Sequence, residues 1–115
     1  MVFKIDGKRA ESIACDVLQK KGYKILEKNF KTKYGEIDII AMDKDTLSFV
    51  EVKARSSRKF GLPEEAVNQR KLQKIRTVAE IYMKNKSNYK KVKVEVVSLE
   101  FAGPLVDKAR IILVD

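Results

Sequence analysis

Two short apolar segments separated by a turn place the strongest constraint on how this chain can fold. Residues 35–41 read Gly-Glu-Ile-Asp-Ile-Ile-Ala, and residues 47–55 read Leu-Ser-Phe-Val-Glu-Val-Lys-Ala-Arg. Both segments are rich in branched or aromatic residues, as strands are. Residues 43–46, Asp-Lys-Asp-Thr, have the composition of a turn. The pattern therefore predicts an antiparallel hairpin.

The strand period of two predicts which side chains of this hairpin share a face. In the first strand, Asp38 falls on the face opposite Ile37 and Ile39. In the second strand, Glu51 and Lys53 share one face. We therefore expect two carboxylates and a lysine to meet on a sheet that is otherwise apolar. Burying such groups is costly unless they bind something.

A divalent-cation site is one interpretation of this group. One or two carboxylates, completed by phosphate oxygens of a substrate, are the usual ligands of Mg²⁺. Lys53 could position or deprotonate a metal-bound water, or neutralise charge that develops on a phosphorus under attack. The alternative is an exposed strand face with a Glu/Lys pair, and Glu-x-Lys alone favours that alternative. The upstream Gly-x-x-Asp and the apolar flanks favour the site.

Length and composition exclude several classes of protein. A chain of 115 residues predicts a single domain, residues 1–115. It has no apolar run long enough to span a bilayer and no apparent leader, so we expect a cytoplasmic protein with no membrane partner. Cys15 is the only cysteine, which excludes an intrachain disulfide. The chain has no histidine, so its chemistry must use carboxylates, lysine, arginine, hydroxyls or a metal.

The distribution of charge indicates a polyanionic partner. The net charge is +9, and residues 53–93 carry thirteen basic but only three acidic residues. A solvated helix face usually mixes the two signs, so nucleic acid is the better interpretation. Six basic residues in this segment are the candidate nucleic-acid contacts: Arg55, Arg58, Lys59, Arg70, Lys71 and Lys74. An acidic protein or an anionic membrane surface remains a third possibility.

Elements on either side of the hairpin are predicted by periodicity. Residues 7–21 have the pattern of an amphipathic helix, with Glu11 at the edge of its apolar stripe. From there the Glu11 carboxylate could reach over the sheet, or it could be an ordinary rim glutamate. A second helix is expected from about Pro63 to Asn85, and strands over residues 23–30, 92–99 and 109–114. This order predicts an α/β fold in which helices pack on a mixed sheet.

Taken together, the motifs resemble those of a known family. They are Glu11 on the first helix, Gly35-Glu36-Ile37-Asp38, Phe49-Val50-Glu51-Val52-Lys53-Ala54-Arg55 and Phe60-Gly61-x-Pro63. In this order they resemble the YraN-like family of predicted endonucleases, and the likeness extends over nearly the whole chain. More remotely the chain is similar to archaeal Holliday-junction resolvases, which share the restriction-endonuclease-like PD-(D/E)xK fold.

The resemblance implies a mixed five-stranded sheet flanked by helices and a role for each motif residue. It implies that Asp38 and Glu51 hold Mg²⁺ or Mn²⁺, that Lys53 assists the attacking water, and that Glu11 completes the site. Glu36 and Gln69 are possible accessory residues. The chain departs from the relatives in its fourth strand. Where they often carry an Arg-Phe-Asp-like sequence, this chain has Val-Lys-Val-Glu at residues 92–95.

The leading hypothesis is therefore a metal-dependent endonuclease acting on DNA, with branched, Holliday-junction-like DNA as a candidate substrate and a homodimer as a candidate assembly. The alternative is a non-catalytic nucleic-acid-binding protein of the same fold, which would bind in a salt-dependent way without cleaving.

Overall fold

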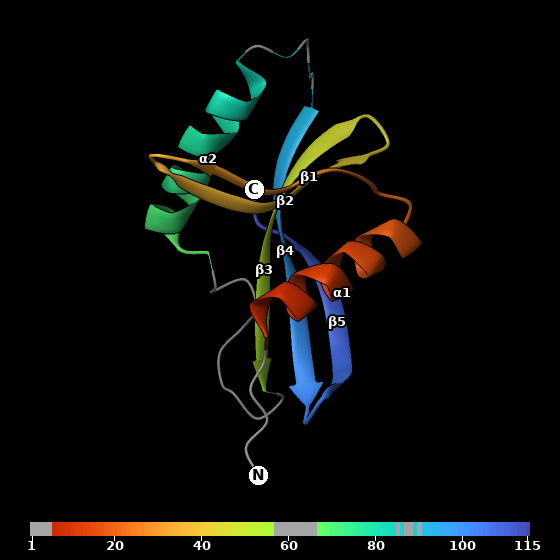
Figure 1. The fold of residues 1–115 in the computed structure, drawn as a ribbon. Coiled ribbons are helices and arrows are strands. Elements are labelled where there is room, and N and C mark those ends of the chain that lie inside the picture. The colour runs from red at the N-terminus through yellow and green to blue at the C-terminus, as the bar shows by residue number, and fades with distance from the viewer. Residues whose placement is uncertain (1–5, 57–66, 85, 87–88, 90) are drawn as a thin grey trace.

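The computed structural model describes residues 6–56, 67–84, 86, 89 and 91–115. These residues form two helices and five strands (Figure 1). In chain order they are α1 (Gly7–Lys20), β1 (Lys24–Thr32), β2 (Gly35–Asp43), β3 (Thr46–Ser56), α2 (Gln69–Met83), β4 (Lys91–Ala102) and β5 (Leu105–Leu113).

All five strands belong to one mixed sheet, in the spatial order β1-β2-β3-β4-β5. Neighbouring strands are antiparallel except β3 and β4, which run parallel. Parallel strands need a crossover connection, and α2 lies on the segment that provides it. The predicted α/β class is thus confirmed, and a mixed five-stranded sheet with two helices is consistent with the restriction-endonuclease-like fold.

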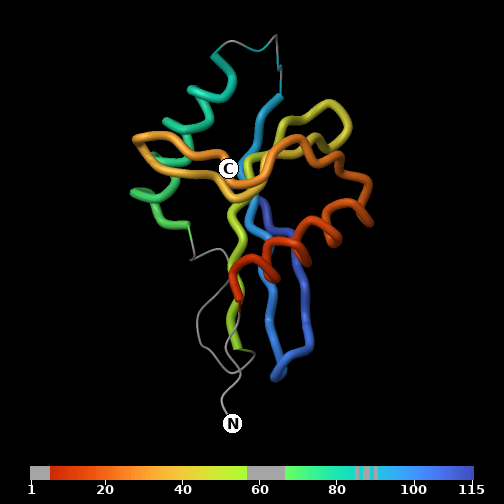
Figure 2. Tube along the Cα trace, viewed as in Figure 1, coloured from red at the N-terminus to blue at the C-terminus, as the bar shows by residue number. Residues whose placement is uncertain are grey.

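The two helices cover opposite faces of the sheet. Phe49 of β3 belongs to the apolar core beneath α2, together with Leu72 and Tyr82. Its neighbour Val50 belongs to a second core beneath α1, together with Leu18. Figure 2 shows the two helices well apart, with α2 beside the β1–β2 hairpin and α1 crossing in front of β4 and β5. In the described part of the chain, neither helix is long and apolar enough to cross a membrane.

The predicted alternation of side chains in β2 is wrong at one point. Ile37 lies in the core beneath α2, whereas Ile39 lies in the core beneath α1. The backbone is irregular at this point. Asn29 has a positive φ of 53° and lies in β1 between two residues paired with β2, on the stretch opposite Asp38. A regular strand does not adopt this conformation, and the simple period of two does not hold across Asp38.

The second helix begins later than predicted. Val67 and Asn68 are not helical, and α2 begins at Gln69. Asn68 is the N-cap, because its side chain accepts a hydrogen bond from the backbone N–H of Lys71 at 2.9 Å. The predicted apolar stripe of the helix is confirmed by burial: Leu72, Ile75, Val78, Ala79 and Tyr82. The expected start at Pro63 lies outside the described residues.

A buried polar network crosses the middle of the sheet. The Glu95 carboxylate is 5% exposed and accepts hydrogen bonds from the Tyr23 hydroxyl at 2.8 Å and the Ser48 hydroxyl at 2.7 Å. Lys93 Nζ lies 3.3 Å from Glu95 and 2.6 Å from Asp43. Burial and the bond to Glu95 raise the pKa of Tyr23 to about 12, so its hydroxyl remains a donor. Each charge in this network therefore has a partner, and we regard it as structural.

Removing one donor from this network should destabilise the fold. We expect Tyr23→Phe to lower the free energy of unfolding by about 1–3 kcal/mol, because Glu95 loses a buried hydrogen-bond donor. Tyr34→Phe, which removes the same hydroxyl from an exposed side chain, is the matched control and should change it by less than about 0.5 kcal/mol. Urea unfolding followed by circular dichroism measures both. Equal effects of the two variants would contradict this interpretation.

Candidate functional site

Asp38 occupies the place where β2 separates from β3. The β2–β3 pairing extends from the turn as far as Ile39 opposite Val50, and Asp38 is the next residue along β2. There the Asp38 side chain, instead of the β2 backbone, pairs with β3: its Oδ2 accepts a hydrogen bond from the backbone N–H of Val52 at 2.8 Å. This bond holds a partly buried carboxylate against the middle of β3.

Glu51 and Lys71 bring together the sheet and the start of α2. Glu51 alternates with Phe49 and therefore points toward the face that α2 covers. Its Oε1 lies 3.5 Å from Lys71 Nζ, and the Glu51 side chain is only 18% exposed. Lys71 is in the first turn of α2, so the packing of this helix on the sheet places a positive charge beside the Glu51 carboxylate.

The charge of Asp38 acts on the carboxyl group of Glu51, which lies on the neighbouring strand. Burial raises the pKa of Glu51, and repulsion by Asp38 raises it further. Burial likewise raises the pKa of Asp38, with a contribution from Glu36. Lys71 acts in the opposite direction on both carboxyl groups. The site therefore concentrates negative charge in a partly desolvated place, and one lysine offsets it in part.

Glu11 approaches Asp38 from α1. Its Oε1 accepts a hydrogen bond from Asn29 Nδ2 at 2.6 Å. Burial, followed by repulsion from Asp38, raises the pKa of Glu11. Glu11, Asp38 and Lys53 line a common cavity of about 330 Å³. Gly7, Ala10, Val52 and Ala54 complete its described lining. The cavity thus joins one helix and two strands.

Of the predicted site residues, Glu51, Glu36 and Gln69 are not among the described residues that line this cavity. Lys53 is exposed, and its charge lowers the pKa of Glu51. Glu36 is exposed near the start of β2 and raises the pKa of both Asp38 and Glu11. Gln69 is the first residue of α2 and is exposed.

The donor set can be compared with the needs of a divalent cation. Asp38 and Glu51 supply carboxylate oxygens, the ligands that Mg²⁺ and Mn²⁺ prefer, and their raised pKa values show the cost of the two charges without a cation. Among the described residues, no three acidic, histidine or cysteine side chains are grouped closely enough to hold a metal ion. The arrangement thus fits a cation held by two carboxylates and completed by water or substrate oxygens.

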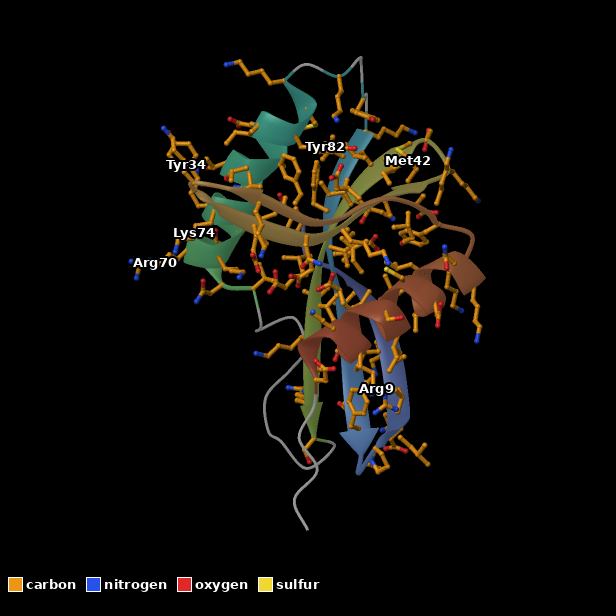
Figure 3. All side chains as sticks on the ribbon, in the orientation of Figure 1. Arg9, Tyr34, Met42, Arg70, Lys74 and Tyr82 are labelled. Carbon is orange, nitrogen blue, oxygen red and sulfur yellow. The ribbon has the colours of Figure 1, made fainter. Side chains whose placement is uncertain are left out.

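The basic residues predicted to contact nucleic acid are not equivalent. Arg55 pairs with Glu100 of β4 at 3.6 Å and its side chain is only 13% exposed, so it belongs to the sheet. Arg70 and Lys74 are exposed on α2, and Lys71 reaches Glu51. Figure 3 shows Arg70 and Lys74 on the outer side of α2. Arg58 and Lys59 lie outside the described residues.

Two members of the site were not assigned their role from the sequence. Asn29 donates a hydrogen bond to Glu11, and its positive φ marks the irregular stretch of β1 opposite Asp38. Asparagine tolerates the left-handed region, so its place inside an otherwise regular strand was a usable signal. Lys71 was predicted to contact phosphate, whereas it pairs with Glu51. Its place in the first helical turn, where a positive charge is unfavourable, was also a signal that a carboxylate lies nearby.

This fold and site define a class: a mixed α/β sheet with acidic side chains and a lysine around one cavity, where two strands separate. The comparison with known families agrees with that class. Residues 10–99 match the family described as "Uncharacterised protein family UPF0102", and the chain belongs to this family. It is the YraN-like family that the motifs resemble.

Relatives in several bacteria share most of the chain. A UPF0102 protein of Caldanaerobacter subterraneus subsp. tengcongensis is 57% identical over 84 residues, which cover 73% of this chain and 68% of the relative. One from Acetivibrio thermocellus is 50% identical over 95 residues, covering 81% and 73%. One from Dictyoglomus thermophilum is 41% identical over 104 residues, covering 88% of each.

The electrostatic coupling of the carboxylates can be tested directly. We expect Asp38→Asn to lower the pKa of Glu51, because it removes the neighbouring negative charge, and Lys71→Met to raise it. Asp45→Asn, at the β2–β3 turn, is the control and should leave it unchanged. Carbon-detected NMR titration of the Glu51 carboxyl group in metal-free buffer measures all three. An unchanged pKa in Asp38→Asn would show that the two carboxylates do not converge.

Proposed function

We propose that this protein is a metal-dependent nuclease that hydrolyses phosphodiester bonds of DNA. The observation that carries the proposal is the position of Asp38 against β3: its carboxylate is bonded to the N–H of Val52, the residue after Glu51, and its charge raises the pKa of the partly buried Glu51. Such an arrangement destabilises the protein alone and is relieved by a cation. Two further observations support the proposal: Glu11 and Lys53 line a cavity together with Asp38, and the chain matches the family of the YraN-like proteins.

In this proposal each residue has a distinct task. Mg²⁺ or Mn²⁺, when bound, would polarise the phosphate and lower the pKa of a water. Asp38 and Glu51 would hold the cation, and the Val52 N–H would fix the orientation of Asp38. Lys53 would hold the attacking water or offset the charge that develops on the phosphate. Glu11, oriented by Asn29, would accept hydrogen bonds from water at the other side of the cavity.

DNA is the proposed substrate because cations are concentrated beside the site. Arg70, Lys71 and Lys74 lie on the first turns of α2, and the chain carries a net charge of +9. Phosphate contacts of this kind give affinity and orientation without reading sequence. Branched DNA is a candidate within this class, on the remote resemblance to junction resolvases, and a dimer would suit such a substrate.

A non-catalytic nucleic-acid-binding protein is the second candidate. Two observations favour it: Glu51 already has a cationic partner in Lys71, and the described residues contain no group of three metal-binding side chains. On this alternative the carboxylates would stabilise the start of α2 and the cations would still bind phosphate. The two candidates differ in whether cleavage occurs when a divalent cation is supplied.

Substitution of a site carboxylate should separate cleavage from binding. We expect Glu51→Gln and Asp38→Asn to slow cleavage of a DNA panel in Mg²⁺ or Mn²⁺ at least about 100-fold, because the cation loses a ligand. Metal-free DNA binding should be retained or tighter, since one negative charge is gone. Lys53→Ala should slow cleavage severely while changing metal affinity less.

The panel comprises branched, nicked, linear and single-stranded DNA, and the control is Asp107→Asn, an exposed carboxylate on β5. Cleavage at an undiminished rate in Glu51→Gln would assign the activity to a contaminant or to another site. Binding by the unaltered protein without cleavage of any substrate, in either metal, would favour the non-catalytic candidate.

The surface of α2 predicts the salt dependence of binding. For duplex DNA, removing one cation that binds a phosphate lowers the slope of log affinity against log salt by about 0.9. We therefore expect the double variant Arg70→Ala, Lys74→Ala to lower that slope by up to about 1.8. Lys108→Ala, Arg110→Ala removes the same charge from exposed positions of β5, at the other edge of the sheet from β1, and should leave it nearly unchanged. Equal slopes in the two double variants would show that the DNA-binding face is not on α2.

A further inference from the structure

A second cavity lies between α2 and the turn that joins β1 to β2. Its volume is about 440 Å³, which lies within the roughly 300–1,000 Å³ of typical small-molecule sites. One wall consists of Arg70, Gln73, Lys74 and Thr77, whose spacing places them on one face of the helix. The other wall is Tyr34, and Figure 3 shows Tyr34, Lys74 and Arg70 gathered on one side of the molecule.

Tyr34 is held in an exposed position. Its side chain is 54% exposed, which is unusual for so large an aromatic group. The backbone N–H of Tyr34 donates to Thr32 Oγ1 at 3.1 Å, and the same hydroxyl donates to the Gly35 carbonyl at 3.1 Å. Gly35 has a φ of +141°, and a Cβ built on it would lie 3.6 Å from Val78 of α2. The turn is therefore packed on the helix, and this packing places the backbone that carries the tyrosine ring beside the helix.

The charge of this cavity suits an anion with a flat apolar part. None of its five described lining residues is acidic, and two are cations. Lys33 Nζ adds a third positive charge, 5.2 Å from the centre of the Tyr34 ring. Gln73 and Thr77 supply polar groups able to bond the edge of a base. An exposed aromatic ring with cations around it is the combination by which proteins bind single-stranded nucleic acid.

We infer that this cavity binds one unpaired nucleobase of a DNA strand, stacked on Tyr34, with the neighbouring phosphates on Arg70 and Lys74. Bases inside a duplex are already stacked and cannot enter, so the site selects DNA that contains an unpaired nucleotide. Arg70 directly precedes Lys71, whose Nζ lies 3.5 Å from Glu51. The bound nucleotide would thus lie close to the phosphate that is cut; this last point alone rests on the proposed function.

Binding in the absence of divalent cations tests the inference. The probes are a short single-stranded oligonucleotide with one 2-aminopurine, whose fluorescence falls on stacking, and a blunt duplex of matched length, both in EDTA. We expect Tyr34→Ala to weaken single-strand binding roughly 5- to 150-fold and to abolish the quenching. Tyr34→Phe should restore both, because it keeps the ring. Duplex binding should change by less than about twofold.

Leu105→Ala is the matched control, since it truncates another highly exposed apolar side chain, at the start of β5, and it should bind both probes normally. Equal weakening of duplex and single strand by Tyr34→Ala would overturn the inference, as would no weakening at all. Displacement of the probe by polyglutamate with the same dependence on Tyr34 would also overturn it, in favour of an acidic peptide. Loss of the Tyr34 effect while cleavage still depends on Glu51 would leave the proposed nuclease intact. The reverse result would leave the base site standing without the nuclease.

Discussion

The separation of β2 from β3 is the constraint on which the candidate site depends. Beyond the pair Ile39–Val50, an N–H of β3 is bonded by the Asp38 side chain instead of a strand. This substitution leaves room beside β3 for a cavity, and it fixes a carboxylate at the cavity wall. Buried backbone N–H groups need hydrogen-bond acceptors, and this bond gives the Val52 N–H an acceptor where the β2–β3 pairing ends. The end of the β2–β3 pairing and the Asp38 carboxylate of the candidate site therefore coincide.

Buried carboxylates in this sheet have two kinds of environment. Glu95 is almost fully buried, yet it has donors from Tyr23, Ser48 and Lys93, so its charge is well compensated. Asp38 and Glu51 are less buried, but each lies near another carboxylate and their pKa values are raised. Hydrogen bonding of the first kind rigidifies a core, whereas partly buried carboxylates with raised pKa values are typical of binding and catalytic sites. The contrast within one sheet strengthens the functional interpretation of the second group.

Much of the fold followed from local pattern, and the failures have identifiable causes. The hairpin, the helix around Glu11 and the buried stripe of α2 were predicted because each depends on a period within one element. The side of the sheet taken by Ile37 was mispredicted because the period of two does not hold across Asp38, opposite the positive φ of Asn29. The start of α2 was misplaced because a proline with two following glutamates outweighed Asn68, which is the actual cap. The pairing of Lys71 with Glu51 depends on how α2 packs against the sheet, and the spacing of residues within one element does not predict such packing.

The parallel pairing of β3 with β4 has a consequence for the order in which the site is assembled. Glu11, Asn29, Asp38 and Glu51 all belong to α1 and the antiparallel strands β1, β2 and β3, whose connections are short. Pairing of β4 must instead close the long segment from Thr46 to Lys91, which carries α2 and therefore Lys71. Longer closures cost more chain entropy and slow folding. The carboxylates thus belong to the locally connected part of the chain, and the crossover helix is the element whose docking adds their compensating charge.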